Sequence, residues 1–313
     1  MNRALAVVWS ILGMLAFAPV GATTDYGLTP IEIAPDTYVF EGRREHFNAA
    51  NGGNIVNIAA IVTDAGVALI DSGPSKRYAE QLRAALARMG APPIVLVFNT
   101  HLHPDHFLGN QVFRDVPIAA LPETLQGIQR DGEAFAAGAY RLVGAWMAGT
   151  EVTPPNQVLQ PGVREIGGHR LHMLALSGHS EADLAIFDAT TGVLFTGDLV
   201  FYQRAPTTPH AHVPAWLESL DRLEALPFEQ VVPGHGPVHR GNAGIVQTRD
   251  YLRGLEAHLH AAAERGLDEA ETLSLPLPRW ARALAVGKAE YRRSVSHLYG
   301  ERERRSLGPI RAD

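Results

Sequence analysis

The sequence predicts an α/β fold of two half-domains followed by a helical extension at the carboxyl end. Short β-branched runs alternate with amphipathic helical stretches, and this alternation occurs twice without a short tandem repeat. The chain has 313 residues, of which 46% are hydrophobic, so one large domain with an appendage is expected. Beyond Gly241 the pattern is helical only, which predicts the extension.

The first half is expected to open with a meander of strands and to continue with a helix and another buried strand. Leu82, Leu86 and Met89 lie on one face of the predicted helix, and Pro92-Pro93 ends it. The predicted elements are strands over 31–40, 54–62 and 67–70, a helix over 76–89 and a strand over 94–98.

The second half repeats the alternation of strands with a helix, and two long helices follow it. Breaks at Pro276 and Pro278 separate these two helices. The predicted elements are strands over 170–176, 184–187, 193–196 and 230–232, and helices over 215–225, 245–264 and 279–297.

The first 22 residues are expected to be a signal peptide and not part of the fold. Arg3 gives a positive start, residues 4–17 are apolar but short for a membrane span, and Val20-Gly21-Ala22 offers a cleavage site. The alternative is an uncleaved anchor, which the short length and the lack of basic residues on the far side disfavour. The predicted protein is periplasmic, is cleaved near Ala22 and keeps no stable membrane span.

The predicted organisation is a signal peptide over 1–22, a main domain over 25–240 and a helical extension over 241–305. The formal net charge is -6, and the short basic run at 301–305 is most simply a solvated helix end, so nucleic acid is not expected as a partner. The chain has no cysteine. Its fold therefore has no disulfide, and no thiolate can act as a ligand or nucleophile.

Residues 101–106 read HLHPDH, directly after the predicted strand over 94–98. Imidazoles and a carboxylate presented together at the end of a buried strand indicate a metal site. His101 and His103 share one side of an extended backbone, whereas Pro104 lets the next two residues turn toward a second position. Two adjacent metal ions are therefore expected, and they need further ligands from elsewhere in the chain.

Three polar residues beside glycines are candidates for those ligands: His179 in SGHS, Asp198 in FTGD and His235 in PGHG. Glycine lets the backbone bend sharply, so that a neighbouring side chain can point into a cleft. Any one of them alone is ordinarily a turn residue. Together, and in this order after HLHPDH, they indicate one common site.

These motifs, in this order, resemble the metallo-β-lactamase-fold hydrolase superfamily over residues 31–238. The resemblance implies an αββα sandwich with the metals at one edge, between the two sheets. It also implies a dinuclear zinc site, with iron or manganese as alternative metals. The implied ligands are His101, His103 and His179 for the first ion, Asp105, His106 and His235 for the second, and Asp198 as the bridge.

Four longer segments resemble a narrower group, the exported quinoprotein relay system zinc metallohydrolases. They are EGRREHFNAANGGNIVN at 41–57, FNTHLHPDHFLGNQVF at 98–113, GDLVFYQRAPTTPHAH at 197–212 and DYLRGLEAHLHAAAERGLD at 250–268. That group takes its name from neighbouring genes of pyrroloquinoline-quinone (PQQ) dependent alcohol oxidation. The resemblance thus implies a functional link to a PQQ-dependent dehydrogenase and leaves the substrate open.

Departures from other branches of the superfamily narrow the expectation. The absence of cysteine removes the cysteine ligand of the broad-spectrum β-lactamases, and Asp198 in a bridging role is unlike their cysteine-free branch. The mixed charge of the extension differs from the basic, tyrosine-rich glutathione-binding domain of glyoxalase II enzymes. Nuclease-type basic elements are also lacking, and a filled second site is unlike the single-iron sulfur dioxygenases.

The predicted function is hydrolysis of a small-molecule substrate by a zinc-dependent enzyme. A metal-bound hydroxide, formed with a pKa of about 7, attacks a thioester, ester, lactone or amide carbonyl. Asp105 is expected to be catalytic, because it can orient the proton of the nucleophile as well as bind metal. The alternatives are a β-lactamase-like activity and a non-catalytic metal- or cofactor-binding accessory protein of the quinoprotein system.

Other polar residues have two interpretations each. Asp71 is either a partner of the ligand loop or a turn or N-cap residue. Tyr202, Arg204 and His210 are candidate substrate contacts, against a packing or surface role. His212 is a surface histidine or a pocket residue, and His46 lies in a polar loop that could overhang the metals without binding them.

Overall fold

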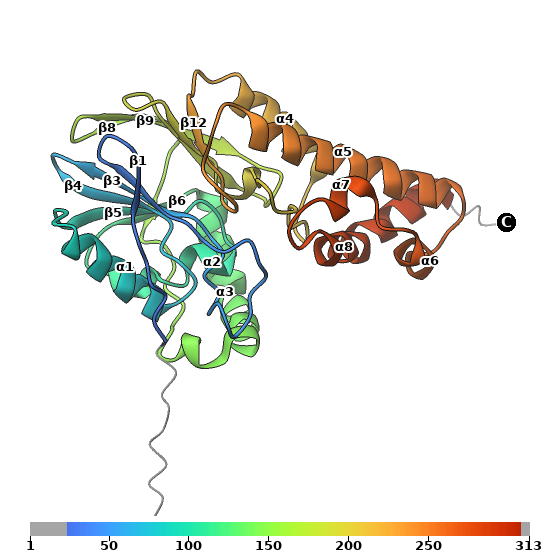
Figure 1. Ribbon diagram of the computed structural model, residues 1–313, viewed down its shortest axis with the longest axis horizontal. Helices are drawn as coiled ribbons and strands as arrows, with labels where there is room; N and C mark the ends of the chain where they lie inside the picture. The colour runs from blue at the N-terminus through green and yellow to red at the C-terminus, as the bar shows by residue number, and fades with distance from the viewer. Residues whose placement is uncertain (1–23, 308–313) are drawn as a thin grey trace, which may run out of the picture.

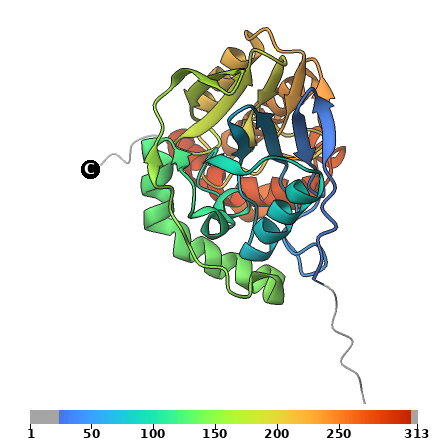
Figure 2. The same ribbon diagram turned by 90° about the vertical axis from the view of Figure 1, so that its left-hand side faces the viewer.

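Two β-sheets face each other in the computed structural model, which describes residues 24–307, and helices cover the outer face of each sheet (Figure 1). The view in Figure 2 shows the same layering from the side, with the sheets stacked between the helices of the two halves. The predicted αββα sandwich is therefore correct. The predicted signal peptide at 1–22 lies outside the described residues.

The first sheet has the order β1-β2-β3-β4-β5-β6-β7. Its first four strands pair antiparallel, whereas β4 to β7 pair in parallel, so the carboxyl ends of β4 and β5 meet at one edge. The strands are β1 (Ile31–Ala34), β2 (Thr37–Phe40), β3 (Ile58–Thr63), β4 (Gly66–Ile70), β5 (Ile94–Phe98), β6 (Ile118–Ala120) and β7 (Gln157–Val158).

The second sheet has the order β13-β12-β11-β10-β9-β8, and only β11 and β12 pair in parallel. It supplies three strand ends to the same edge of the sandwich as β5. The strands are β8 (Gly162–Ile166), β9 (His169–Leu176), β10 (Asp183–Asp188), β11 (Val193–Phe195), β12 (Gln230–Val232) and β13 (His239–Arg240).

The central strands β3 and β4 of the first sheet are buried on both faces, which explains why they are continuously apolar. In β3, Ala59 and Ile61 point into the core between the sheets, while Ile58 and Ala60 pack toward α1 (Lys76–Arg88). The inter-sheet core is completed from the second sheet by residues such as Leu184 and Ile186 of β10. Successive side chains of such a strand therefore point alternately into two apolar layers. Neither face of the strand is polar.

Helices differ between the two halves. The first half carries α1, the short α2 (Pro104–Phe107) and the long α3 (Pro122–Val143), with 3-10 turns at Asn110–Phe113 and Gly144–Met147. The second half carries a 3-10 turn at Gly197–Leu199 and α4 (Val213–Glu224). No helix within residues 24–307 is long and apolar enough to span a membrane.

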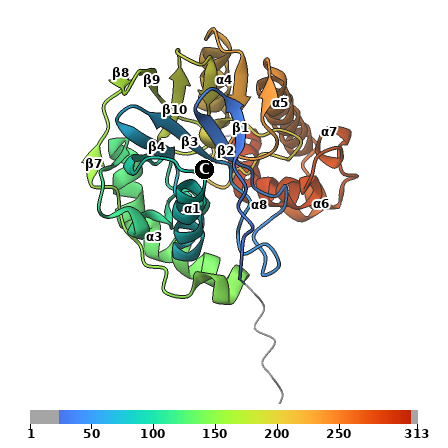
Figure 3. The same cartoon turned by 60° about the vertical axis from the view of Figure 1, so that its left-hand side comes forward.

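The carboxyl-terminal helices are α5 (Ala243–Glu264), α6 (Glu269–Ser274), α7 (Arg279–Arg282) and α8 (Gly287–Leu307). Figure 3 shows α5, α6 and α7 on one side of the sandwich, away from β7 and β8. α5 packs against both α4 and α8. One apolar cluster runs from Trp216 of α4 through Leu252 and Leu255 to Tyr291 of α8, so the extension shares a core with the second sheet.

Several predicted elements need correction. The strand over 31–40 is a hairpin, because Asp36 adopts a left-handed conformation (φ 56°) between β1 and β2. The helix over 279–297 is in fact α7 and α8, separated where Val286 has φ 53°. α3 was not predicted at all, and neither was α6, although Asp268 and Glu271 form a capping box at its start.

A buried ion pair ties α8 to the loop that follows the turn at Gly197–Leu199. The Arg204 guanidinium is 2% exposed, and its Nη2 lies 3.5 Å from Oε1 of Glu290, which is 0% exposed. Thr207 donates its hydroxyl to the same Glu290 oxygen at 2.8 Å. The backbone N–H of Ala205 also donates to Ala285 just before α8, at 3.1 Å. The position of α8 is therefore fixed relative to this loop.

We expect Glu290→Ala to lower the free energy of unfolding by about 3–5 kcal/mol, because it leaves the Arg204 charge buried without its partner. Lys288→Ala is the matched control, since Lys288 is exposed on the same helix. Urea denaturation measures both. A Glu290→Ala midpoint equal to that of Lys288→Ala would show that this ion pair does not hold α8.

Candidate metal centre

The HLHPDH segment runs from the loop after β5 into α2, at the edge where strands of both sheets end. His103 has extended backbone and occupies the N-cap position of α2, and Pro104 occupies its first turn. This turn separates the side chains of His101 and His103 from those of Asp105 and His106. All four side chains are buried.

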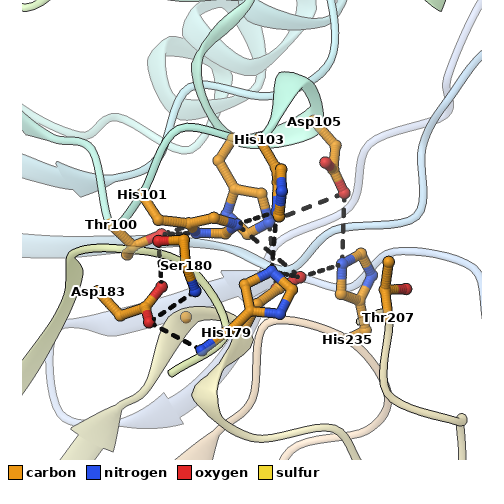
Figure 4. Close-up of polar contacts among 12 residues, drawn as sticks. Thr100, His101, His103, Asp105, His179, Ser180, Asp183, Thr207 and His235 are labelled. Atoms are coloured by element: carbon orange, nitrogen blue, oxygen red, sulfur yellow. Dashed lines mark hydrogen bonds and ion pairs between the residues drawn. The ribbon is translucent and has the colours of Figure 1, made fainter. Parts of the chain in front are cut away.

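Three imidazole nitrogens form the first cluster (Figure 4). His103 Nδ1 lies 3.0 Å from His101 Nε2 and 2.8 Å from His179 Nε2. His179 comes from the connection between β9 and β10, so the cluster joins the two sheets. Three nitrogens this close can share few protons, so their lone pairs suit a cation.

The second cluster contains Asp105, His106 and His235. Oδ2 of Asp105 lies 3.3 Å from His235 Nε2 and 3.7 Å from His106 Nε2. His235 follows β12, on the second sheet. This set again joins the HLHPDH segment to the opposite sheet.

Asp198 lies between the two clusters, in the 3-10 turn that follows β11. Its Oδ2 is 3.3 Å from His179 Nε2 and 3.2 Å from His235 Nε2, while its Oδ1 is 3.2 Å from His106 Nε2. One carboxylate thus contacts ligand atoms of both clusters. The structure brings together all seven residues that the sequence singled out, with Asp198 in a bridging position.

The donor set fits two divalent cations. Asp198 Oδ1 and His106 Nε2 are buried, and neither has a hydrogen-bond partner of good geometry among the described residues. Buried polar atoms without partners are costly, and a cation between them would satisfy both. Nitrogen and carboxylate oxygen donors of this kind are those that zinc prefers.

Protonation states differ between the two clusters. Burial holds the pKa of His101, His103 and His179 well below the usual histidine value, so these rings are neutral donors. Burial acts in the same direction on His106, but the carboxylates of Asp71 and Asp198 outweigh it and raise its pKa well above the usual value. The second cluster, which has more carboxylates around it, therefore stabilises positive charge.

Asp71 supports the HLHPDH segment from behind. Its carboxylate accepts from the backbone N–H of Thr100 at 2.7 Å and the Thr100 hydroxyl at 2.9 Å, and lies 2.7 Å from His106 Nδ1. The residue has φ 65°, a strained backbone for a non-glycine residue. Of the two interpretations of Asp71, the structure favours the partner of the ligand loop, which orients His106.

Two hydrogen-bonding residues that sequence reasoning missed hold the other ligands. Asn57 donates its side-chain amide to Pro233 O and Gly236 O, at 2.8 and 2.7 Å, and so fastens the loop of His235. Asp183 accepts from the backbone N–H groups of His179 and Ser180, at 3.1 and 3.0 Å. The signal for Asp183 was its position four residues after His179, within reach of a tight turn.

The glycine beside His235 is required by close approach. A Cβ on Gly234 would lie 2.0 Å from Asp198 Oδ1, in the bridging carboxylate. The loops of Asp198 and His235 can therefore meet only with glycine at this position.

His210 is the outer partner of His103. Its Nδ1 lies 2.7 Å from His103 Nε2, the ring atom that faces away from the first cluster. Because His103 offers Nδ1 to the cluster, its Nε2 carries the proton and donates to His210. His210 was predicted to contact substrate, and the structure places it against a metal-ligand candidate as well as in the pocket wall.

A cavity of about 210 Å³ opens directly above the two clusters. Its floor contains members of both: His103, Asp105, Asp198 and His235. The remaining walls come from α3, from the loop around His46, from residues 204–210 and from α8. The metal centre is thus accessible to a small molecule.

Tyr202 does not line this cavity: its ring packs on His239, with centroids 4.3 Å apart, so its role as a substrate contact stays a prediction. Arg204 does line the cavity, but its guanidinium is engaged with Glu290, Ala205 O and Thr207. His212 instead caps α4, with its Nδ1 accepting from Ala215 N at 3.3 Å.

The family model of the metallo-β-lactamase superfamily matches residues 51–235, more than half of the chain. The chain belongs to the metallo-β-lactamase superfamily. The match ends at His235, so it covers every residue of the two clusters.

Relatives within the superfamily differ in name. The chain is 29% identical to the acyl-coenzyme A thioesterase MBLAC2 of Gallus gallus over 56% of this chain and 68% of that one. It is 30% identical to the hydroxyacylglutathione hydrolase of a Nostoc species over 55% and 56%. It is 21% identical to the linear primary-alkylsulfatase of a Pseudomonas species, over 66% of this chain and 46% of that one.

Solved structures show the same fold. The metallo-β-lactamase from Pontibacter korlensis superposes with a TM-score of 0.59 at 20% identity, covering 72% of this chain and 99% of that one. The metallo-β-lactamase IND-7 gives 0.57 at 21% identity, covering 72% and 96%. Both similarities extend over the sandwich. At these low sequence identities they support the fold alone.

Zinc should stabilise the fold, because a cation that binds only the folded chain shifts the unfolding equilibrium. We expect zinc at a hundredfold excess over its Kd to raise Tm by about 5–10 °C relative to protein stripped with EDTA. Differential scanning calorimetry measures the shift, and Asp198→Ala should reduce it strongly. Equal Tm values with and without zinc would contradict this superfamily site.

His210→Ala should weaken zinc binding by about tenfold or more, because His103 loses the acceptor that orients its ring. Competition with a chromophoric chelator measures the affinity. His212→Ala, in the same loop but at the start of α4, is the matched control and should leave the affinity unchanged. Equal affinities of the two variants would show that His210 does not position His103.

Proposed function

We propose that this protein is a dinuclear zinc-dependent hydrolase of small carbonyl compounds, with thioesters and esters as the favoured substrates. The observation that carries the proposal is that the cavity floor exposes members of both metal-ligand clusters at once. A carbonyl compound in this cavity would meet both clusters. The similarity to an acyl-coenzyme A thioesterase and a hydroxyacylglutathione hydrolase supports the same class of reaction.

Two zinc ions held by the seven side chains would supply a water acidified to near neutral pH and positive charge to polarise the carbonyl. The chain itself contributes position and proton handling. Asp105 lines the cavity and is only 5% exposed. Burial opposes its ionisation, but His106 and His235 outweigh burial and lower its pKa, so the carboxylate is available to accept a hydrogen bond from the attacking water.

The cavity walls favour a substrate with an apolar portion. Phe47, Phe135 and Leu142 line the space above the floor, and an acyl chain can bury its methylene groups against them. This composition gives little support to the alternative of a β-lactam specialist. The cavity also argues against a non-catalytic metal carrier, because a carrier does not require a cavity of substrate size.

We also propose the cellular context that the sequence resemblance implies: export to the periplasm and a functional link to a PQQ-dependent dehydrogenase. The apolar stretch at 4–17 and the small residues Val20-Gly21-Ala22 that follow it support export. Amino-terminal sequencing of protein recovered from the periplasm should find a start near Thr23.

The test of function is hydrolysis of a panel of thioesters, esters, lactones, amides and β-lactams by zinc-loaded protein. We expect turnover of thioesters or esters, and a loss of about a hundredfold or more in kcat/KM for Asp105→Asn. Asp115→Asn is the control, because Asp115 pairs with Arg83 at the surface.

Two results would contradict the proposal. One is equal activity of EDTA-stripped and zinc-reloaded protein. The other is that the wild type turns over no substrate of the panel, although it and Asp105→Asn both bind zinc. That result would favour the accessory role.

A further inference from the structure

The wall of the cavity formed by α3 is apolar along its whole length. Ala134, Phe135, Gly138, Ala139 and Leu142 follow the helical spacing of one face, and all five line the cavity. Leu142 is 55% exposed, a large apolar side chain at the mouth. The lining residues between Phe135 and Leu142 are small, and a Cβ on Gly138 would meet nothing within 4 Å, so this wall has room for an extended apolar group.

The opposite rim is cationic. Arg293 of α8 lines the cavity and is exposed, and it makes no ion pair with any residue in the described range 24–307. Arg293 shares the lining of this cavity with His46 and His210. The nearby Asp131 is already bonded to Arg130, at 2.8 and 3.0 Å.

Arg204, the other arginine of the cavity, is not available to a ligand. Its guanidinium faces Glu290 and donates to Ala205 O and Thr207 Oγ1, both at 3.2 Å. Arg293 thus differs from Arg204: it lines the same cavity, and its guanidinium has no hydrogen-bond or ion-pair partner among residues 24–307.

The backbone beneath Arg293 is held in place from both sides. Glu290, one helical turn earlier, takes part in the buried ion pair with Arg204. Ser294, the next residue, accepts a hydrogen bond from the buried Thr208 hydroxyl at 2.7 Å. A cationic side chain on a fixed backbone loses less entropy when it binds an anion, which favours recognition.

We propose that Arg293 is the specificity-determining residue for an amphiphilic anion, whose carboxylate, sulfonate or phosphate it binds while the apolar part lies along α3. The reactive carbonyl then lies between, over the metal centre, so this inference rests on the proposed hydrolase function. A guanidinium suits such oxyanions because its donors match two oxygens at once.

The binding test uses two probes with the same rings, 8-anilinonaphthalene-1-sulfonate and the neutral N-phenyl-1-naphthylamine, on zinc-loaded protein. Arg293→Gln should weaken the sulfonate probe by about tenfold and leave the neutral probe unchanged. Arg292→Gln is the matched control, since Arg292 is exposed on α8 and does not line the cavity. Leu142→Ala should weaken both probes together.

The proposal is overturned if Arg293→Gln binds the sulfonate probe as the wild type does, or loses both probes equally. An unchanged affinity of both probes in Leu142→Ala would contradict the apolar wall. Circular dichroism verifies that each variant is folded.

The activity test compares two thioesters of hexanoic acid, one with mercaptopropionate and one with N-acetylcysteamine as the thiol. Arg293→Gln should raise KM for the anionic thioester about tenfold at nearly constant kcat, and leave the neutral one unchanged. An equal change for both overturns the assignment. If the wild type turns over neither thioester while probe binding depends on Arg293, the hydrolase function fails and the anion site stands.

Discussion

The carboxylate of Asp198 contacts imidazoles from three separate segments of the chain. Because all of these groups are buried, their contact is stable only if a positive charge compensates them. His106, His179 and His235 surround it within 3.3 Å, and Asp198 itself is 3% exposed. So many buried donors in one place cost free energy unless cations or protons satisfy them. The two sheets are joined at this edge through these side chains, so the sandwich and its metal site depend on each other.

Three of the ligand candidates are held from outside by buried polar residues. Asp71 orients His106, Asp183 holds the backbone of His179, and Asn57 fastens the loop of His235. The Asn57 contacts join the two sheets, whereas the other two stay within one sheet. All three hold ligands at the ends of strands and not on a long loop. The carboxyl-terminal helices extend the same principle, because Glu290 fixes α8 where it completes the cavity wall.

Much of the sandwich and the whole candidate ligand set were accessible from the sequence. Candidate ligands such as Asp198 and His235 can be recognised in a single sequence, because each stands beside glycine in a short motif. α3 was missed because Gly127, Gly132 and Gly138 interrupt its helical pattern, and packing on the HLHPDH segment stabilises it nonetheless. The break at Val286 and the cavity role of α8 depend on contacts with residues 204–208, nearly a hundred positions away. No local pattern carries such long-range information. The packing of Tyr202 was not predicted for the same reason, since its neighbour His239 comes from a distant strand.

The central claim is that the seven side chains hold two metal ions and that Asp198 joins them. Metal content per chain, measured by inductively coupled plasma mass spectrometry after zinc loading and gel filtration, tests it most directly. The account predicts two zinc ions per chain in the wild type and a substoichiometric content in Asp198→Ala. One ion or none in the wild type, or two ions still bound in Asp198→Ala, would contradict it.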